Sequence, residues 1–137
     1  MDDRRTYRRV PAKGTALLVY EEGAAPQEII ATMVNLSSSG MAVLASEPLE
    51  RGATVSVTLV DVPPFTDRIM LGEMEVVSVT PARCGNSSGF RFGLQFRNGD
   101  GTTIARVLQG LQSQTYLEAK KRAAMAKRQI KPGRSWL

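Results

Sequence analysis

Four arginines lie within six positions near the start of the chain, in the segment RRTYRR that runs from Arg4 to Arg9. A guanidinium group donates two parallel hydrogen bonds, which fit a phosphate group or the O6 and N7 acceptors of a guanine base. Its flat face can also stack on a purine ring. Charge-dense chain ends are usually solvated and need no ligand. The arginine run therefore predicts a binding segment only where a second feature of the chain supports it.

A second segment whose side chains could bind a ligand is NLSSSG, from Asn35 to Gly40. Its amide and hydroxyl groups can donate and accept hydrogen bonds. Gly40 can adopt a positive φ or allow a base to approach the backbone closely. Asn, Ser and Gly are also the residues of an ordinary turn. Taken alone, this segment fits a simple loop better than a binding site.

Metal and catalytic chemistry have little support in the sequence. The chain has no histidine and one cysteine, Cys84, which excludes an internal disulfide and a zinc cluster. The acidic residues Asp61, Asp67, Glu73 and Glu75 fall in strand and loop segments, where solvent-facing charges are expected. No glycine-rich phosphate loop opens a helix. We therefore predict a protein that is not an enzyme and holds no metal.

Charge is distributed unevenly along the 137 residues, whose net charge is +5. Residues 1–9 carry +2, residues 118–137 carry +6, and the segment between them carries −3. An anionic partner is therefore expected at the chain ends. For the C-terminal segment a solvated helical extension is the favoured alternative. Its basic residues are Lys120, Lys121, Arg122, Lys127, Arg128, Lys131 and Arg134.

The elements that must position these segments are predicted to be short strands, because apolar residues alternate with polar ones or gather in β-branched runs. Turn residues separate the runs. Six strands with no helical pattern between them favour a mainly β fold, an antiparallel barrel whose closure removes exposed edges. The predicted strands are Gly14–Tyr20, Glu28–Val34, Met41–Ala45, Thr54–Val60, Ile69–Thr80 and Phe90–Phe96.

A helix is predicted after the last strand, because the apolar spacing changes to i, i+3, i+4 and i+7. We expect a loop from Asn98 to Gly101 and a helix N-cap at Asp100 or Thr102. The apolar face should pack on the barrel, and the helix should continue into solvent until Pro132 and Gly133 end it. The residues of that face are Ile104, Val107, Leu108 and Leu111.

Length and hydropathy indicate a single cytoplasmic domain. A chain of 137 residues with 42% hydrophobic content suits one core. No apolar stretch approaches the roughly 18 residues of a membrane span, and the charged start is unlike a signal peptide.

In combination, the two segments resemble the signatures of the PilZ domain, the bacterial receptor for cyclic di-GMP. Arg5 and Arg9 match the motif Arg-x-x-x-Arg. Asn35, Ser37 and Gly40 match the motif Asp/Asn-x-Ser-x-x-Gly, with its spacing intact. The strand FGLQF resembles the last barrel strand of the family, which a C-terminal helix follows. The resemblance covers residues 3 to about 115.

The resemblance implies three parts of the chain. Residues 1–12 would form a flexible, arginine-rich ligand-binding arm, with Val10 and Pro11 as its hinge. Residues 13–115 would form a six-stranded antiparallel PilZ-type β-barrel with its packed α-helix, and residues 116–137 a basic helical extension or tail.

The resemblance also implies a ligand and an output. Cyclic di-GMP would bind and order the arm, and this would switch an interaction with a downstream partner that the sequence does not name. Motility, surface attachment, exopolysaccharide production and virulence are the outputs of the family. An arginine at position 4 is associated with an intercalated pair of ligands. The implied ligand-binding residues are Arg4, Arg5, Arg8, Arg9, Asn35, Ser37 and Gly40.

Two alternatives stay open. A protein-docking module would keep the PilZ fold without the ligand, although the intact motifs argue against it. A nucleic-acid-binding barrel would use the basic ends on phosphates, but it would need several aromatic residues on its surface for base stacking. Aromatic residues are only 6% of the chain, and most of them lie in apolar runs.

Overall fold

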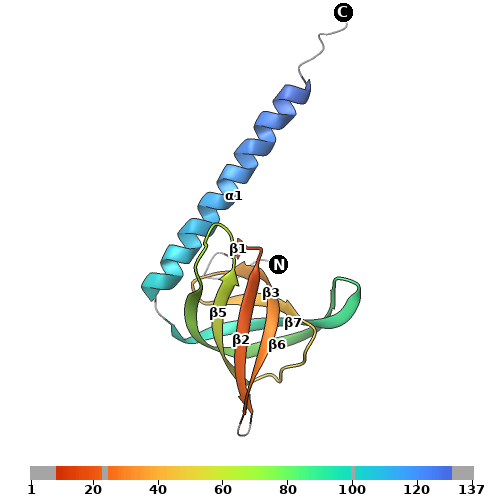
Figure 1. Ribbon diagram of the computed structural model, residues 1–137, viewed down its shortest axis with the longest axis vertical. Helices are drawn as coiled ribbons and strands as arrows, with labels where there is room; N and C mark the ends of the chain where they lie inside the picture. Colours follow the sequence, from red (N-terminus) through yellow and green to blue (C-terminus); the bar gives the residue numbers. More distant parts are fainter. Residues whose placement is uncertain (1–8, 23–24, 100, 131–137) are drawn as a thin grey trace, which may run out of the picture.

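The computed structural model describes residues 9–22, 25–99 and 101–130 (Figure 1). Arg4, Arg5 and Arg8 of the predicted site lie outside these ranges. Within them the chain forms seven strands and one helix. The elements are β1 (Val10–Pro11), β2 (Thr15–Glu22), β3 (Ala25–Leu36), β4 (Gly40–Ala45), β5 (Thr54–Asp61), β6 (Ile69–Cys84), β7 (Ser87–Gly99) and α1 (Gly101–Ile130).

Six of the strands close into an antiparallel barrel. The hydrogen-bonded order runs β3, β2, β5, β6, β7 and β4, and the additional pairing of β3 with β4 closes the ring. The short β1 adds to β3 outside this ring. The prediction of a six-stranded antiparallel barrel followed by a C-terminal helix is confirmed.

The barrel interior holds the apolar half of each alternating strand. On β5, for example, Val55, Val57 and Leu59 are each 1% exposed, whereas Thr54 and Ser56 face outward. Burial of an aliphatic side chain of this size stabilises the fold by about 1.5 to 3 kcal/mol. Similar alternation on β2 and in the middle of β7 leaves an outward face on which polar residues can form a site.

The end of β7 differs from the prediction. A loop was expected from Asn98, but Asn98 pairs with Glu73 and Gly99 with Gly72. The antiparallel register places these two residues opposite the first part of β6, so that backbone pairing continues β7 beyond its apolar run. The helix then begins at Gly101, so that Thr102 lies in its first turn and is not the N-cap. Asp100, the other predicted cap, lies outside the described residues.

The first part of α1 lies against one end of the barrel (Figure 1), and the predicted apolar face of the helix packs there. Ile104, Val107 and Leu111 are buried in the barrel's own core cluster, and Leu108 packs against it. Gly110 allows close contact with the loop after β5, since an added Cβ would lie 2.5 Å from Cζ of Phe65.

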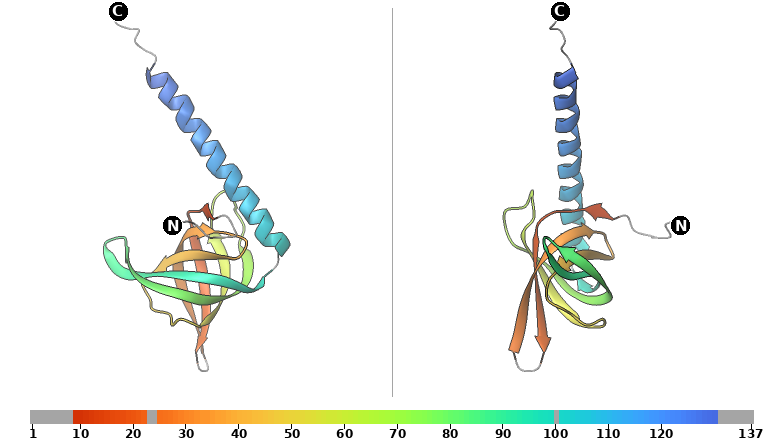
Figure 2. Two further views of the ribbon diagram at one scale, coloured as in Figure 1. Left: turned by 180° about the vertical axis from the view of Figure 1, so that it is seen from behind. Right: turned by 90° about the vertical axis from the view of Figure 1, so that its right-hand side faces the viewer.

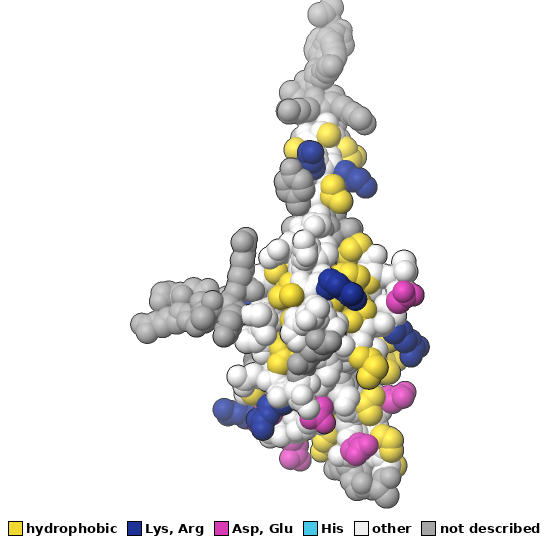
Figure 3. Space-filling model, turned by 90° about the vertical axis from the view of Figure 1, so that its left-hand side faces the viewer, with side chains coloured by type: hydrophobic (Ala, Val, Ile, Leu, Met, Phe, Trp, Pro, Cys, Tyr) yellow, Lys and Arg dark blue, Asp and Glu magenta, His cyan; other side chains and the backbone are white. Residues whose placement is uncertain are grey.

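The described side chains of α1 beyond Leu111 are exposed, and the helix projects away from the barrel (Figure 2) and continues to Ile130. Lys120, Lys121 and Arg122 are exposed there, as are Leu117 and Met125. On the face drawn in Figure 3 the acidic side chains lie over the barrel, and basic side chains also lie on the projecting helix. Among the described residues there is no helix with both the length and the apolar character that a bilayer span needs.

Candidate functional site

The two predicted motifs meet because β1 pairs with β3 at the start of the NLSSSG loop. Val10 lies opposite Leu36 and Pro11 opposite Asn35. One residue further, the Ala12 amide donates to the Val34 carbonyl oxygen at 3.1 Å. Val10 and Ala12 are buried, which anchors this segment to the barrel. The pairing places Arg9, immediately before β1, beside the loop.

A β-bulge precedes the NLSSSG loop. The register between β3 and β4 shifts between Met33 and Asn35, so that Val34 has no direct partner on β4. A bulge bends its strand and redirects the side chains that follow. Asn35 is half-buried at this bend and lines the cavity described below.

Ser37 organises the loop itself. Its side-chain Oγ accepts hydrogen bonds from the backbone amides of Ser39 (3.2 Å) and Gly40 (3.3 Å), and it lies 3.1 Å from Oγ of Ser39. The Ser37 amide donates to the Gly40 carbonyl oxygen at 2.8 Å, which closes the turn. Ser37 is only 4% exposed. A direct hydrogen bond from its hydroxyl to the ligand stays a prediction, whereas its bonds within the loop are part of the fold.

Gly40 is required by the contact between two strands. It lies opposite Gln95, and an added Cβ would run into the carbonyl oxygen of Leu94 and lie 3.1 Å from Cα of Gln95. Its φ is not positive, unlike that of Gly14, Gly52, Gly72 and Gly85. The suggestion that Gly40 adopts a positive φ is therefore wrong: the close approach of β4 and β7 needs the missing side chain.

A cavity of about 330 Å³ lies on this outer surface of the barrel. It brings together the four predicted site residues that the structure describes: Arg9, Asn35, Ser37 and Gly40. The volume lies at the lower end of the range of about 300 to 1,000 Å³ that is typical of ligand pockets. Further lining residues, which the sequence analysis missed, are Ser39, Ser78, Thr80, Arg91, Gly93 and Gln95.

The missed residues come mostly from β6 and β7. Arg91, Gly93 and Gln95 alternate with the buried Phe92 and Leu94, so their outward direction could be inferred from the sequence. Their place in the cavity could not, because it depends on the pairing of β7 with β4.

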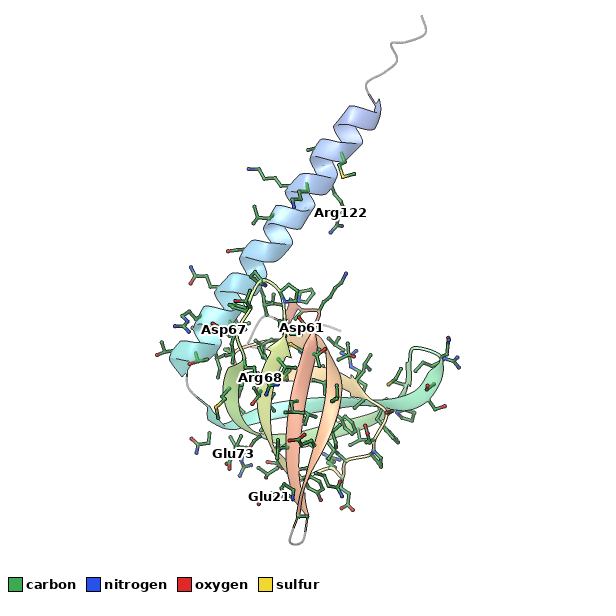
Figure 4. The ribbon with its side chains drawn as sticks, viewed as in Figure 1. Glu21, Asp61, Asp67, Arg68, Glu73 and Arg122 are labelled. Atoms are coloured by element: carbon green, nitrogen blue, oxygen red, sulfur yellow. The ribbon has the colours of Figure 1, made fainter. Side chains whose placement is uncertain are left out.

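The acidic residues considered for catalysis do not converge. Asp61, Asp67 and Glu73 are exposed, and Figure 4 shows them at separate places along β5, the following loop and β6. Glu75 forms an ion pair with Arg97. In the described part of the chain, no group of three or more His, Cys, Asp or Glu side chains is arranged to hold a metal ion.

Residues 3–113 match the PilZ domain family, and the chain therefore belongs to that family. The match includes both motifs, all the strands of the barrel and the part of α1 that packs on them. No curated protein sequence is similar enough to the chain to count as a match.

Solved structures of PilZ proteins share the fold. The PilZ domain of YcgR from Escherichia coli with c-di-GMP is 19% identical, with a TM-score of 0.64 over 89% of this chain and 98% of that one. The MrkH–c-di-GMP complex of K. pneumonia is 17% identical, with a TM-score of 0.63 over 89% of this chain and 57% of that one. The inhibitor of motility MotI/DgrA of Bacillus subtilis is 18% identical, with a TM-score of 0.58 over 84% of this chain and 53% of that one. The chain thus spans little more than half the length of the last two proteins.

Proposed function

We propose that this protein is a receptor for cyclic di-GMP and that the ligand binds in the cavity beside the NLSSSG loop. The observation that carries the proposal is the lining of this cavity, where Arg9 of one family motif lies with Asn35, Ser37 and Gly40 of the other. Membership of the PilZ family and the c-di-GMP complexes of YcgR and MrkH support the same ligand.

The chemistry of the lining suits a guanine nucleotide. Cyclic di-GMP carries two phosphates and two guanines. The guanidinium group of Arg9 fits a phosphate or the O6 and N7 acceptors of guanine. Asn35 offers an amide oxygen to the N–H groups at the guanine edge. A carboxylate, which many family members have at this position, would accept these N–H groups more strongly, so the affinity of this chain depends more heavily on its arginines.

The finer parts of the proposal concern the residues before Arg9 and the output. Arg4, Arg5 and Arg8 would close over the bound ligand, and Arg4 would allow an intercalated pair of ligands to bind. The closed segment would present a new surface to a downstream protein that controls motility, attachment, exopolysaccharide production or virulence. A cytoplasmic location stays a prediction.

Isothermal titration calorimetry of the full chain tests the proposal, with cyclic di-GMP as ligand and GTP and a short DNA duplex as controls. We expect saturable binding of cyclic di-GMP and much weaker binding of GTP. Binding of DNA without binding of cyclic di-GMP would refute the receptor function and favour a nucleic-acid-binding barrel.

A further inference from the structure

We propose that Arg91 of β7 is a further ligand-binding residue, which binds the nucleotide of cyclic di-GMP that lies farther from the NLSSSG loop. The proposal rests on the receptor function proposed above. Neither family motif includes Arg91, which lies on the last strand of the barrel.

The register of β4 and β7 sets the distance between Arg91 and the loop. Gln95 lies opposite Gly40 at the end of the loop, whereas Arg91 lies opposite Leu44, four residues further along. A strand rises about 3.3 Å per residue, so the two positions on β7 are separated by about 13 Å. The cavity, which both Gln95 and Arg91 line, therefore extends well beyond the motif.

The floor between the two ends is low at Gly93 and carries two hydroxyl side chains beside the apolar Val77. Gly93 lies midway between Gln95 and Arg91, and an added Cβ there would run into Oγ of Ser78 on β6. In the register of β6 and β7, Ser78 lies opposite Gly93 and Thr80 lies opposite Arg91. Both hydroxyl side chains line the cavity. One ligand can therefore lie across the floor from the loop to Arg91 without meeting a bulky side chain at Gly93.

The charge of the lining favours an anionic or acceptor-rich ligand at both ends. Among the described lining residues the charged ones are Arg9 and Arg91, and none is acidic. Arg97 lies on the same outward face of β7 but is outside the cavity and is paired with Glu75. Arg91 has no such carboxylate partner among the described residues. Its guanidinium group is thus available to a ligand, whereas that of Arg97 is already neutralised.

The ligand has two equivalent halves, which explains why a second arginine is useful. When the loop and Arg9 hold one nucleotide, the other still presents a phosphate and the O6 and N7 edge of its guanine. Both are acceptor pairs that fit a guanidinium group. Arg91 would bind one of them and so favour the cyclic dinucleotide over a single guanine nucleotide.

The test is the affinity of Arg91→Gln for cyclic di-GMP, measured by calorimetry on the full chain. We expect the dissociation constant to rise about 10- to 100-fold, as for loss of a hydrogen-bonded charge. The thermal midpoint without ligand should not change, because Arg91 is exposed. Arg51→Gln is the matched control, since Arg51 is exposed and lies outside the cavity lining. Its affinity should equal that of the wild type.

Arg91→Lys separates the charge of Arg91 from the planar shape of its guanidinium group. A lysine keeps the positive charge and can contact a phosphate or guanine O6 and N7, but it lacks the planar fork and the stacking face of arginine. Recovery of most of the affinity would indicate that the ligand needs the charge, and little recovery that it needs the planar group. Wild-type affinity in Arg91→Gln, or an equal loss in Arg51→Gln, would overturn the proposal while leaving the receptor function intact. A wild type that does not bind cyclic di-GMP would instead refute the receptor function itself.

Discussion

Pro11 of β1 lies directly opposite Asn35 of β3. This pairing joins the two PilZ motifs, because Arg9 stands two residues before Pro11 and Asn35 opens the NLSSSG loop. Val10 was expected to act as a hinge, since a residue before proline is held extended. The structure shows Val10 extended, buried and paired with Leu36, so that the direction in which the chain reaches Arg9 is set by the barrel.

The first prediction concerns Arg9. Arg9→Ala should weaken the binding of cyclic di-GMP by about 1.5 to 3 kcal/mol, the range for hydrogen bonds to charged groups. Calorimetry measures the loss. Because Arg9 is exposed and precedes β1, the thermal midpoint of the unliganded protein should stay the same. A marked fall in that midpoint would show that Arg9 is structural. Arg5→Ala is expected to behave in the same way, although Arg5 lies outside the described residues.

The second prediction concerns Ser37, the buried serine of the loop. Ser37→Ala removes the acceptor of the Ser39 and Gly40 amides, so the free energy of unfolding should fall by about 1 to 3 kcal/mol. Denaturant unfolding without ligand measures this change. Ser38→Ala, at the exposed neighbouring position, is the control and should leave stability unchanged. Equal stability of the two variants would contradict a structural role of Ser37 in the loop.

The third prediction separates the fold from the ligand at Gly40. Gly40→Ala places a Cβ against the Leu94 carbonyl oxygen, and a backbone atom cannot move aside as a side chain can. The unliganded protein should therefore lose about 1 to 3 kcal/mol of stability, as in other overpacked sites. Gly101→Ala is the control, because nothing lies within 4 Å of an added Cβ at Gly101. A fully stable Gly40→Ala protein that no longer binds would mean that the glycine serves the ligand alone.

The fourth prediction concerns ligand number and rests on Arg4. The wild type should bind two molecules of cyclic di-GMP per chain, because two stacked ligands bring four phosphates and a further arginine can neutralise or stack on the additional nucleotide. Arg4→Leu should bind one molecule, with weaker overall affinity. Native mass spectrometry counts the ligands directly. One molecule on the wild type would refute the stoichiometry and leave the receptor function in place.

Local patterns in the sequence were sufficient for the six strands of the barrel and for the helix, whereas the short β1 was not predicted. The alternation of Val55, Val57 and Leu59 with polar neighbours predicted β5, and the spacing of Ile104, Val107 and Leu111 predicted the packed face of α1. The boundaries differ from the prediction where pairing extends an element. Asn98 belongs to β7 because Glu73 of β6 lies opposite it.

The sequence determined the site only in part. Its motifs identified four residues whose side chains or backbone suit a guanine nucleotide, namely Arg9, Asn35, Ser37 and Gly40. Tertiary structure decided the rest: that Ser37 is buried by its own loop, that Gly40 is needed by β7, and that Arg91 lines the same cavity as Arg9. The physical reason is that side-chain direction along a strand follows from the two-residue period of the chain itself. Which outward residues become neighbours follows from the register between strands, which is set by the packing of the whole barrel.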